Sequence, residues 1–256
     1  MKTVYNDGEN KTGQISFPDG SVCTYKIVPS NRRTMALQVT KEGEVLVKIP
    51  RYVSLAAGQG FILENKEWVY KQVSKVQKKL REKQEFSWKN GAVVLLFGKN
   101  ILLSVIADTS ARNCLIRKTD GKITITGPFD EHNREAYELG VREGMKLWYR
   151  KIARAYLEEK TAWWASHMGV AYEKIAIRDQ ATRWGSCSTR GNLNFNWRLV
   201  LLPAELADYV VVHELAHRLH MNHSREFWNV VGSVIPDYME RRKELKLWSE
   251  KLDLIY

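Results

Sequence analysis

The sequence predicts an α+β protein with a strand-rich N-terminal half and a mainly helical C-terminal half that also contains a small sheet. Three observations support this class. Short runs rich in branched and aromatic residues alternate with turn signals as far as residue 127, apolar residues then recur at helical spacing, and an H-E-x-x-H motif lies within an apolar segment. We therefore expect two domains, residues 1–127 and residues 128–256.

The N-terminal domain should begin with a loose terminus or a first hairpin, because residues 1–20 are polar and rich in glycine. Three strands are expected next, at residues 22–28, 34–39 and 44–50. The segment Lys41–Gly43 is typical of a tight turn and would join the last two strands.

A single amphipathic helix is expected over residues 54–83, with a break at Gly58 or Gly60. Its buried stripe should consist of Val69, Val73, Val76 and Leu80. The opposite face carries Lys71, Lys75 and Lys78. We interpret this basic face as the solvated side of the helix, with nucleic acid or another anion as the alternative.

Two hairpins should complete the N-terminal domain. The segments 92–97 and 100–107 flank a Gly-Lys turn, and the segments 113–118 and 122–126 flank an Asp-Gly turn. The C-terminal domain should then open with a long helix, capped by Asp130, bent at Gly140 or Gly144 and stopped by Gly169. A short strand at 174–178 and a last, highly charged helix at 238–252 are also expected.

Composition limits the class of protein. The chain has 256 residues, 44% of them apolar, and no apolar run long enough to span a membrane. Its N-terminus lacks the apolar segment of a secretory signal, and its three cysteines are an odd number without metal-pair spacing. We therefore expect a cytoplasmic protein without a membrane partner. The net charge of +11 either serves solubility or favours contact with a nucleic acid or nucleotide.

The H-E-x-x-H motif spans His213 to His217 and predicts a metal site. A helix turns about 100° per residue, so these two imidazoles lie on one face, one turn apart. Zinc needs a third protein ligand, and we favour His223 over His220, whose Cα on an unbroken helix would lie about 10.5 Å from that of His213. His223 can reach the metal if the helix stops first, and we expect it to stop at Asn222.

Glu214 is the candidate catalytic residue, because it lies between the two histidines on the same helix. There it can accept a proton from a zinc-bound water whose pKa the metal lowers to about 7. The spacing from His217 to His223 matches the longer H-E-x-x-H-x-x-G-x-x-H pattern, with His220 in the place of glycine.

The sequence resembles the YgjP-like metallopeptidase family, which is distantly related to the SprT-like zinc proteases. The resemblance is dense from residue 174 to residue 245 and weaker in two strands and one helix of the first half. It rests on five motifs: R-W-G-S-C-S, G-N-L-N-F-N-W, P-x-x-x-x-x-Y-V-V-V-H-E-L-A-H, N-H-S-x-x-F-W and Pro236-Asp237-Tyr238.

This resemblance implies a zincin-like metallohydrolase domain in which His213, His217 and His223 hold zinc and Glu214 is the catalytic acid. It also implies a protein or peptide substrate bound along an edge strand, formed by Leu193–Asn196 or by the R-W-G-S-C segment. Several nearby residues have open roles. Cys187 could place a thiol near zinc, and Arg183 could contact an oxyanion or a phosphate. Glu226, Asp237 and Glu240 could orient the histidines, and Glu240 is also a rival third ligand.

We expect a zinc-dependent metallopeptidase that hydrolyses peptide bonds through a metal-activated water. Two alternatives stay open at this point. One is a metal-dependent nucleoside triphosphate hydrolase, since the same activated water can attack a phosphoanhydride. The other is a nucleic-acid-associated protein in which the metal is structural, since the excess of basic residues favours polyanions.

Overall fold

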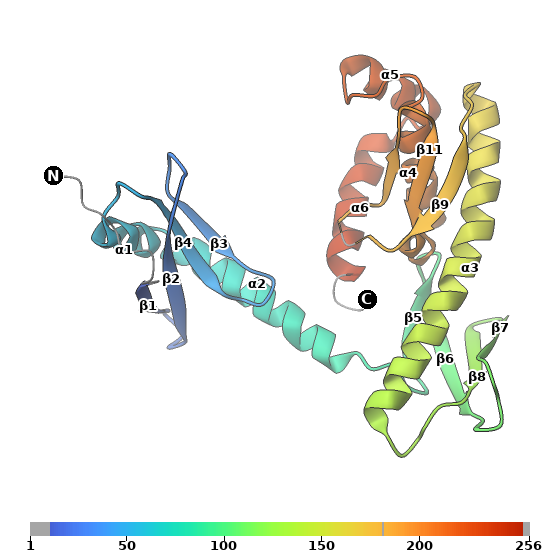
Figure 1. Cartoon of the computed structure of the whole chain (residues 1–256), viewed down its shortest axis with the longest axis horizontal. Coiled ribbons are helices and arrows are strands. Elements are labelled where there is room, and N and C mark those ends of the chain that lie inside the picture. The colour runs from blue at the N-terminus through green and yellow to red at the C-terminus, as the bar shows by residue number, and fades with distance from the viewer. Residues whose placement is uncertain (1–10, 181, 253–256) are drawn as a thin grey trace. The chain divides into compact units, whose positions relative to one another are not determined.

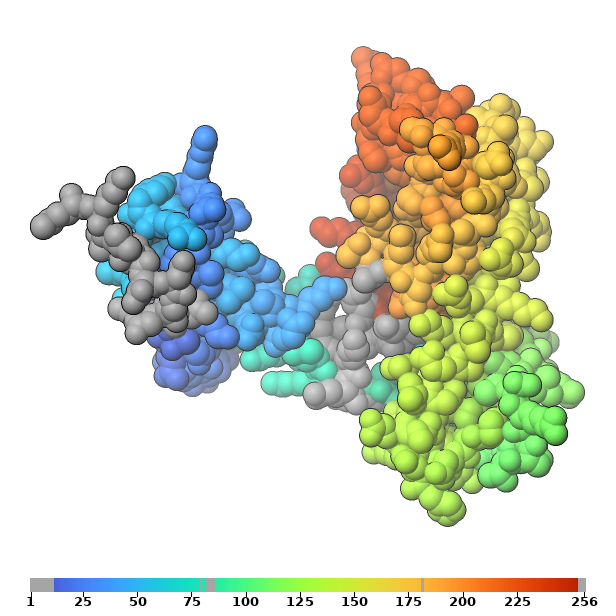
Figure 2. Space-filling model, in the orientation of Figure 1, coloured from blue at the N-terminus to red at the C-terminus, as the bar shows by residue number. Residues whose placement is uncertain are grey.

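The structure is a computed structural model, and it describes residues 11–180 and 182–252. The chain forms two compact units that divide between Glu85 and Phe86. Figure 1 shows their elements, and Figure 2 shows their surfaces, with the first unit in blue to cyan and the second in green to red. The fold class is α+β, as expected, and the proposed domain boundary after residue 127 falls inside the second unit.

The first unit contains a four-stranded sheet in the order β1-β2-β4-β3. The strand β1 (Lys11–Ser16) pairs antiparallel with β2 (Val22–Ser30), so of the two alternatives, a loose terminus or a first hairpin, residues 11–16 form a hairpin. The strand β4 (Val45–Pro50) runs parallel to β2 and antiparallel to β3 (Ala36–Val39). The three predicted strands of this region are confirmed.

Two helices, α1 (Leu55–Glu64) and α2 (Lys66–Glu85), replace the single interrupted helix that the sequence predicted. The break is at Asn65, whose side-chain amide donates to the carbonyl of Phe61 over 2.8 Å. Gly58 does not break the helix, because it packs in the core against Ile27 and Ile49.

The core of the first unit lies between its sheet and these helices, and it includes Ile27, Val47, Ile62, Val69 and Val73. The predicted stripe on α2 is confirmed in its first half only, since Val76 is half-buried and Leu80 is exposed. The three lysines on the opposite face are exposed, as predicted.

The second unit begins with a four-stranded sheet in the order β5-β6-β8-β7. Both predicted hairpins are confirmed: β5 (Val93–Leu96) pairs with β6 (Lys99–Ala107), and β7 (Leu115–Thr119) pairs with β8 (Lys122–Gly127). The two hairpins join through parallel pairing of β6 with β8.

The long helix α3 (Arg134–Met168) connects the two sheets of the second unit (Figure 1). Asn133 caps it, accepting from the Ala136 amide over 3.1 Å, so the predicted cap at Asp130 is wrong by one turn. The helix continues through both internal glycines. A Cβ on Gly144 would lie 2.8 Å from Ile125, so this glycine allows close packing on β8. Gly169 ends the helix in the left-handed conformation, as predicted.

The predicted small sheet follows, in the order β10-β11-β9. The strand β9 (Lys174–Arg178) pairs parallel with β11 (Asn192–Asn196), and β10 (Gly185–Cys187) pairs antiparallel with β11. Tyr149 of α3 joins β5 to the segment that follows β11, because its hydroxyl donates to the Leu95 carbonyl while its ring stacks on Trp197.

Asp179 fixes the end of β9. Its carboxylate lies 2.7 Å from Lys146 Nζ and 2.6 Å from Arg198 Nη1, and it accepts from the Trp197 indole over 3.0 Å. Burial by itself would raise the pKa of this carboxyl, but the bonds from Lys146 and Trp197 and the charge of Arg198 outweigh it and hold the pKa at about 2. The contact ties β9 to α3 and to the short helix η1 (Trp197–Leu201).

Three helices complete the unit: α4 (Ala204–Ala216), α5 (Arg225–Val234) and α6 (Tyr238–Leu252). The last helix is confirmed with its predicted bounds. Most of α4 is buried, as expected for a helix that is apolar on every side. Among the described helices, none combines the length and apolar character needed to cross a lipid bilayer.

Candidate metal centre

The helix α4 carries His213 and ends at the second histidine of the motif. Ala216 is its last residue and His217 its C-terminal cap. The predicted end at Asn222 is therefore wrong by about a turn and a half. After His217, the amides of Arg218 and Leu219 donate hydrogen bonds to the carbonyls of Leu215 and Ala216, each three residues earlier in the chain. The early end leaves six residues for the turn that brings His223 back over the helix.

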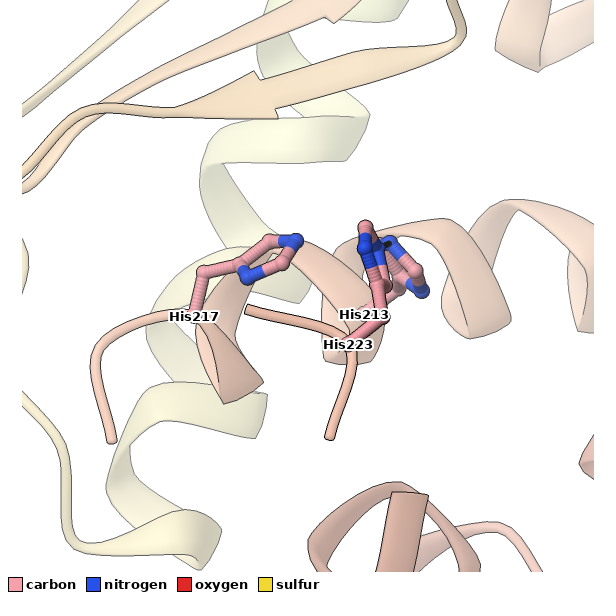
Figure 3. Close-up of side chains that lie close together, drawn as sticks. All are labelled: His213, His217 and His223. Atoms are coloured by element: carbon pink, nitrogen blue, oxygen red, sulfur yellow. Dashed lines mark hydrogen bonds between the residues drawn. The ribbon is translucent and has the colours of Figure 1, made fainter. Parts of the chain in front are cut away.

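Three imidazoles converge on one point. One ring nitrogen from each of His213, His217 and His223 lies within 4.8 Å of the other two, and Nε2 of His213 is 3.1 Å from Nε2 of His223. Figure 3 shows the ring of His217 directed toward the other two rings. A four-coordinate zinc with bonds of 2.0–2.1 Å places its ligand nitrogens about 3.4 Å apart. The three rings therefore fit a shared metal ion.

His220 is a part of the site that the sequence did not reveal. Its backbone carbonyl lies 3.1 Å from Nδ1 of His217. A carbonyl can only accept a hydrogen bond, so Nδ1 of His217 carries the proton and Nε2 keeps its lone pair for a metal. No side-chain motif encodes this contact, because any residue at position 220 has a carbonyl.

Burial keeps the first two imidazoles neutral. It is the main cause that lowers the pKa of His213 to about 3, with smaller contributions from the charges of His217, His223 and Arg242. Burial also lowers the pKa of His217. Neutral imidazoles have free lone pairs, which is the form that binds a metal.

Aromatic side chains of α5 support the three histidines. The Phe227 ring lies 4.9 Å from the rings of His213 and His223 and 4.6 Å from that of His217, and Trp228 stacks on His223 at 5.8 Å. Ser224 caps α5, accepting from the Phe227 amide. This cap fixes the start of α5 directly after His223.

Glu214 is 5% exposed and lies against the small sheet. Burial raises the pKa of its carboxyl to about 8. A Cβ added to Gly185 of β10 would lie 2.6 Å from Oε1 of Glu214 and 2.7 Å from its Cγ, so only glycine leaves room for this carboxylate. A glycine inside a strand often marks such a close approach, and Gly185 in the R-W-G-S-C segment was the available signal for it.

Arg218 ties the end of α4 to two other segments. Its guanidinium donates to the carbonyls of Ala171 over 3.0 Å and Thr189 over 3.1 Å. Thr189 lies in the turn between β10 and β11, so this arginine joins the edge of the small sheet to the residue next to His217. The sequence analysis did not identify Arg218, because these contacts depend on distant parts of the chain.

The remaining candidates lie outside the imidazole cluster. Cys187 is half-buried, and its thiol, whose pKa burial raises, contacts the Ser188 carbonyl. The Arg183 side chain is exposed, and no carboxylate pairs with it in the described part of the chain. Asp237 is exposed and pairs with Arg241. Glu226 and Glu240 are exposed. Among the described residues, the only group of side chains that could hold a metal ion consists of the three histidines, and it includes neither of these acids.

Three comparisons place the chain among known proteins. The family model of the YgjP-like metallopeptidase domain matches residues 33–247. No curated protein matches. Among solved structures, the metallopeptidase zymogen of Pyrococcus abyssi abylysin is 23% identical over 35% of this chain and 90% of its own, with a TM-score of 0.33, too low to support an argument about the site. Since the family match spans most of the sequence, the chain belongs to the YgjP-like metallopeptidase domain family.

Proposed function

We propose that this protein is a zinc-dependent peptidase in which Glu214 is the general base and His213, His217 and His223 hold the metal. Family membership supports the coarser statement that it is a metallopeptidase, with a metal ion and peptide substrates. The finer assignment is carried by one observation: three imidazole nitrogens lie within 4.8 Å of one another beside a buried carboxyl group.

The donor set favours zinc over other divalent ions. Three neutral imidazoles suit a borderline-soft cation, whereas magnesium and calcium prefer oxygen ligands. Three protein ligands also leave a fourth position open, as catalytic zinc sites require. When bound, zinc supplies a Lewis acid that polarises a carbonyl and lowers the pKa of a water molecule.

Glu214 supplies the proton transfers. The carboxylate accepts a proton from the attacking water and passes it to the amine that leaves when the peptide bond breaks. Burial raises the pKa of this carboxyl, so its carboxylate form is a stronger proton acceptor than that of an exposed glutamate. Gly185 fixes its position, because the strand backbone and the carboxylate are as close as a glycine allows.

The strand β10 offers the edge along which we propose that a peptide binds. β11, which carries Leu193–Asn196, is central in its sheet and has partners on both sides. β10 is at the end of the sheet, contacts α4 and contains Gly185, which touches Glu214. A peptide paired to the outer edge of β10 would present its backbone beside Glu214.

The decisive test is Glu214→Gln. We expect the variant to bind zinc in the same ratio as the wild type, measured by elemental analysis, and to lose peptide hydrolysis by about 10²- to 10⁴-fold. Glu240→Gln is the matched control, because it removes an exposed carboxylate from α6 and should change neither quantity. Retained hydrolysis in Glu214→Gln would remove this residue from the mechanism, and zinc loss in Glu240→Gln would restore Glu240 as a ligand.

The substrate class is tested separately. Denatured proteins, peptide pools and nucleoside triphosphates should be compared with and without a zinc chelator. We expect chelator-sensitive cleavage of peptides only. Cleavage of triphosphates alone would replace the peptidase with a nucleotide hydrolase, and absence of chelator-sensitive hydrolysis would favour a structural metal. We also propose a cytoplasmic location, consistent with three cysteines that are free in the structure.

A further inference from the structure

Two loops of the first unit leave its sheet at the same end. β2 and β4 are parallel neighbours, and the last residue of each, Ser30 and Pro50, are paired in the register. The loop after β2 and the loop after β4 therefore start side by side (Figure 1). The carboxyl ends of adjacent parallel strands are a common position for ligand sites, because the loops that follow them converge there.

Hydrogen bonds join the two loops into one surface. Arg51 Nε donates to Oδ1 of Asn31 over 3.1 Å, and the Tyr52 hydroxyl donates to the Arg33 carbonyl over 2.8 Å. We call Arg32, Arg33, Arg51 and Tyr52 the arginine–tyrosine surface. Its four side chains come from both loops, and all four residues are exposed.

Tyr52 is the unusual member of this surface. The residue is 77% exposed, although its hydroxyl is held by the bond to the Arg33 carbonyl. In the described part of the chain no other aromatic ring stacks on it. A ring that is fixed at its hydroxyl end and open on its faces can stack on a planar ligand, and less conformational entropy is lost than for a mobile side chain.

The charge of the surface has one sign. Residues 30–34 and 50–54 include three arginines and no acidic residue. The guanidinium groups of Arg32 and Arg33 have no carboxylate partner among the residues that the structure describes. Elsewhere in the same unit, by contrast, Lys26 pairs with Glu44 at 3.2 Å. The guanidinium groups of Arg32 and Arg33 therefore complement an anionic ligand.

We propose that the arginine–tyrosine surface binds single-stranded nucleic acid, with Tyr52 stacked on a base and the arginines on the flanking phosphates. Stacking on an aromatic ring combined with a basic surface is how proteins bind unpaired strands without sequence preference. A duplex hides its base faces and would use only the arginines. An acidic peptide or a polyphosphate would also use only the arginines, so none of these three ligands explains the exposed ring. This proposal does not depend on peptidase activity.

The test is fluorescence anisotropy with the full chain and three labelled probes: oligothymidylate, an abasic oligomer of equal length, and a duplex. Tyr52→Ala should weaken oligothymidylate binding by about 5- to 150-fold and leave the abasic oligomer unaffected. Tyr52→Phe keeps the ring and should retain most of the affinity. Because Tyr52 is so exposed, the alanine variant removes little packing, and circular dichroism should show an unchanged fold.

The arginines are tested by salt dependence. The double variant Arg32→Gln, Arg33→Gln should lower the slope of log affinity against log salt by about 1.4, since each phosphate contact of a single strand contributes about 0.7. Arg117→Gln, an exposed arginine of β7, is the matched control and should leave affinity unchanged. The proposal is overturned if oligothymidylate does not bind at low salt, or if Tyr52→Ala has no effect or weakens binding of the abasic oligomer equally. It is also overturned if Arg117→Gln lowers affinity as much as the Arg32→Gln, Arg33→Gln double variant does.

Discussion

The metal centre of the second unit and the arginine–tyrosine surface of the first unit place their polar groups in opposite environments. His217 and Glu214 are 9% and 5% exposed, whereas Tyr52 is 77% exposed. Burial lowers the pKa of His213 to about 3 and raises that of Glu214 to about 8, whereas a guanidinium stays charged in any folded protein. Desolvation thus determines the protonation of the side chains in the metal centre, whereas the permanent charge of the arginines determines the attraction of anions to the arginine–tyrosine surface.

This difference separates the two sites by experiment. Salt screens exposed charges over about 10 Å at 0.1 M, but it screens buried groups much less. Changes in the metal centre should therefore alter hydrolysis, and zinc content where a metal ligand is removed, at any salt concentration. Changes on the arginine–tyrosine surface should alter only salt-dependent binding.

The largest effect is expected from His217→Ala. Loss of one of three imidazoles should lower the zinc content from about one ion per chain to near zero and abolish hydrolysis, measured by elemental analysis and a peptide assay. His132→Ala removes an exposed histidine of the same unit and should change neither value. Tyr52→Ala should also keep full zinc and full hydrolysis. Full zinc in His217→Ala would contradict the assigned ligand set.

The next effect is expected from Gly185→Ala. The added methyl group must displace Glu214, and a misplacement of about 1 Å can lower a rate by about 10²-fold. We expect kcat to fall by that order while zinc content stays constant. Gly60→Ala is the matched control, because an added Cβ there meets nothing within 4 Å. An unchanged kcat in Gly185→Ala would mean that the contact does not position the carboxylate.

A smaller effect, on stability, is expected from Asp179→Asn. It removes a charge that Lys146 and Arg198 stabilise, and should lower the free energy of unfolding by about 0.5 to 2 kcal/mol after solvent screening. The pKa of Asp179 is lowered from 3.8 to about 2, so its contribution is complete above pH 3.8 and is lost as pH falls toward 2. Urea unfolding of both proteins should show a difference that disappears in this range.

The smallest effect is expected from Glu44→Gln in the first unit. The pair with Lys26 joins two side chains that are 44% and 56% exposed, and such surface pairs contribute about 0–1 kcal/mol. Urea unfolding should detect a change below that of Asp179→Asn. A larger change would show that exposed charges matter more to this fold than we infer.

Much of the fold follows from local patterns in the sequence. Alternating apolar residues and turn residues predicted three strands of the first four-stranded sheet and all four strands of the second, and the 3.6-residue period predicted α3, with its stop at Gly169. The spacing of His213, His217 and His223 singled out the three side chains that converge in the structure. These features were predictable because they depend on residues close together in the chain.

Tertiary contacts determined the features that the sequence analysis placed wrongly or did not identify. The helix α4 ends at Ala216, and not at Asn222, where the local sequence predicted its end. Near this end, carbonyls of two distant segments hold the guanidinium of Arg218. Gly144 allows close packing on β8, which a helical pattern in the sequence does not reveal. The sequence by itself determined which side chains can bind a metal. Only the folded chain decided which backbone carbonyl orients His217 and which glycine makes room for Glu214, because these contacts join residues by proximity in space.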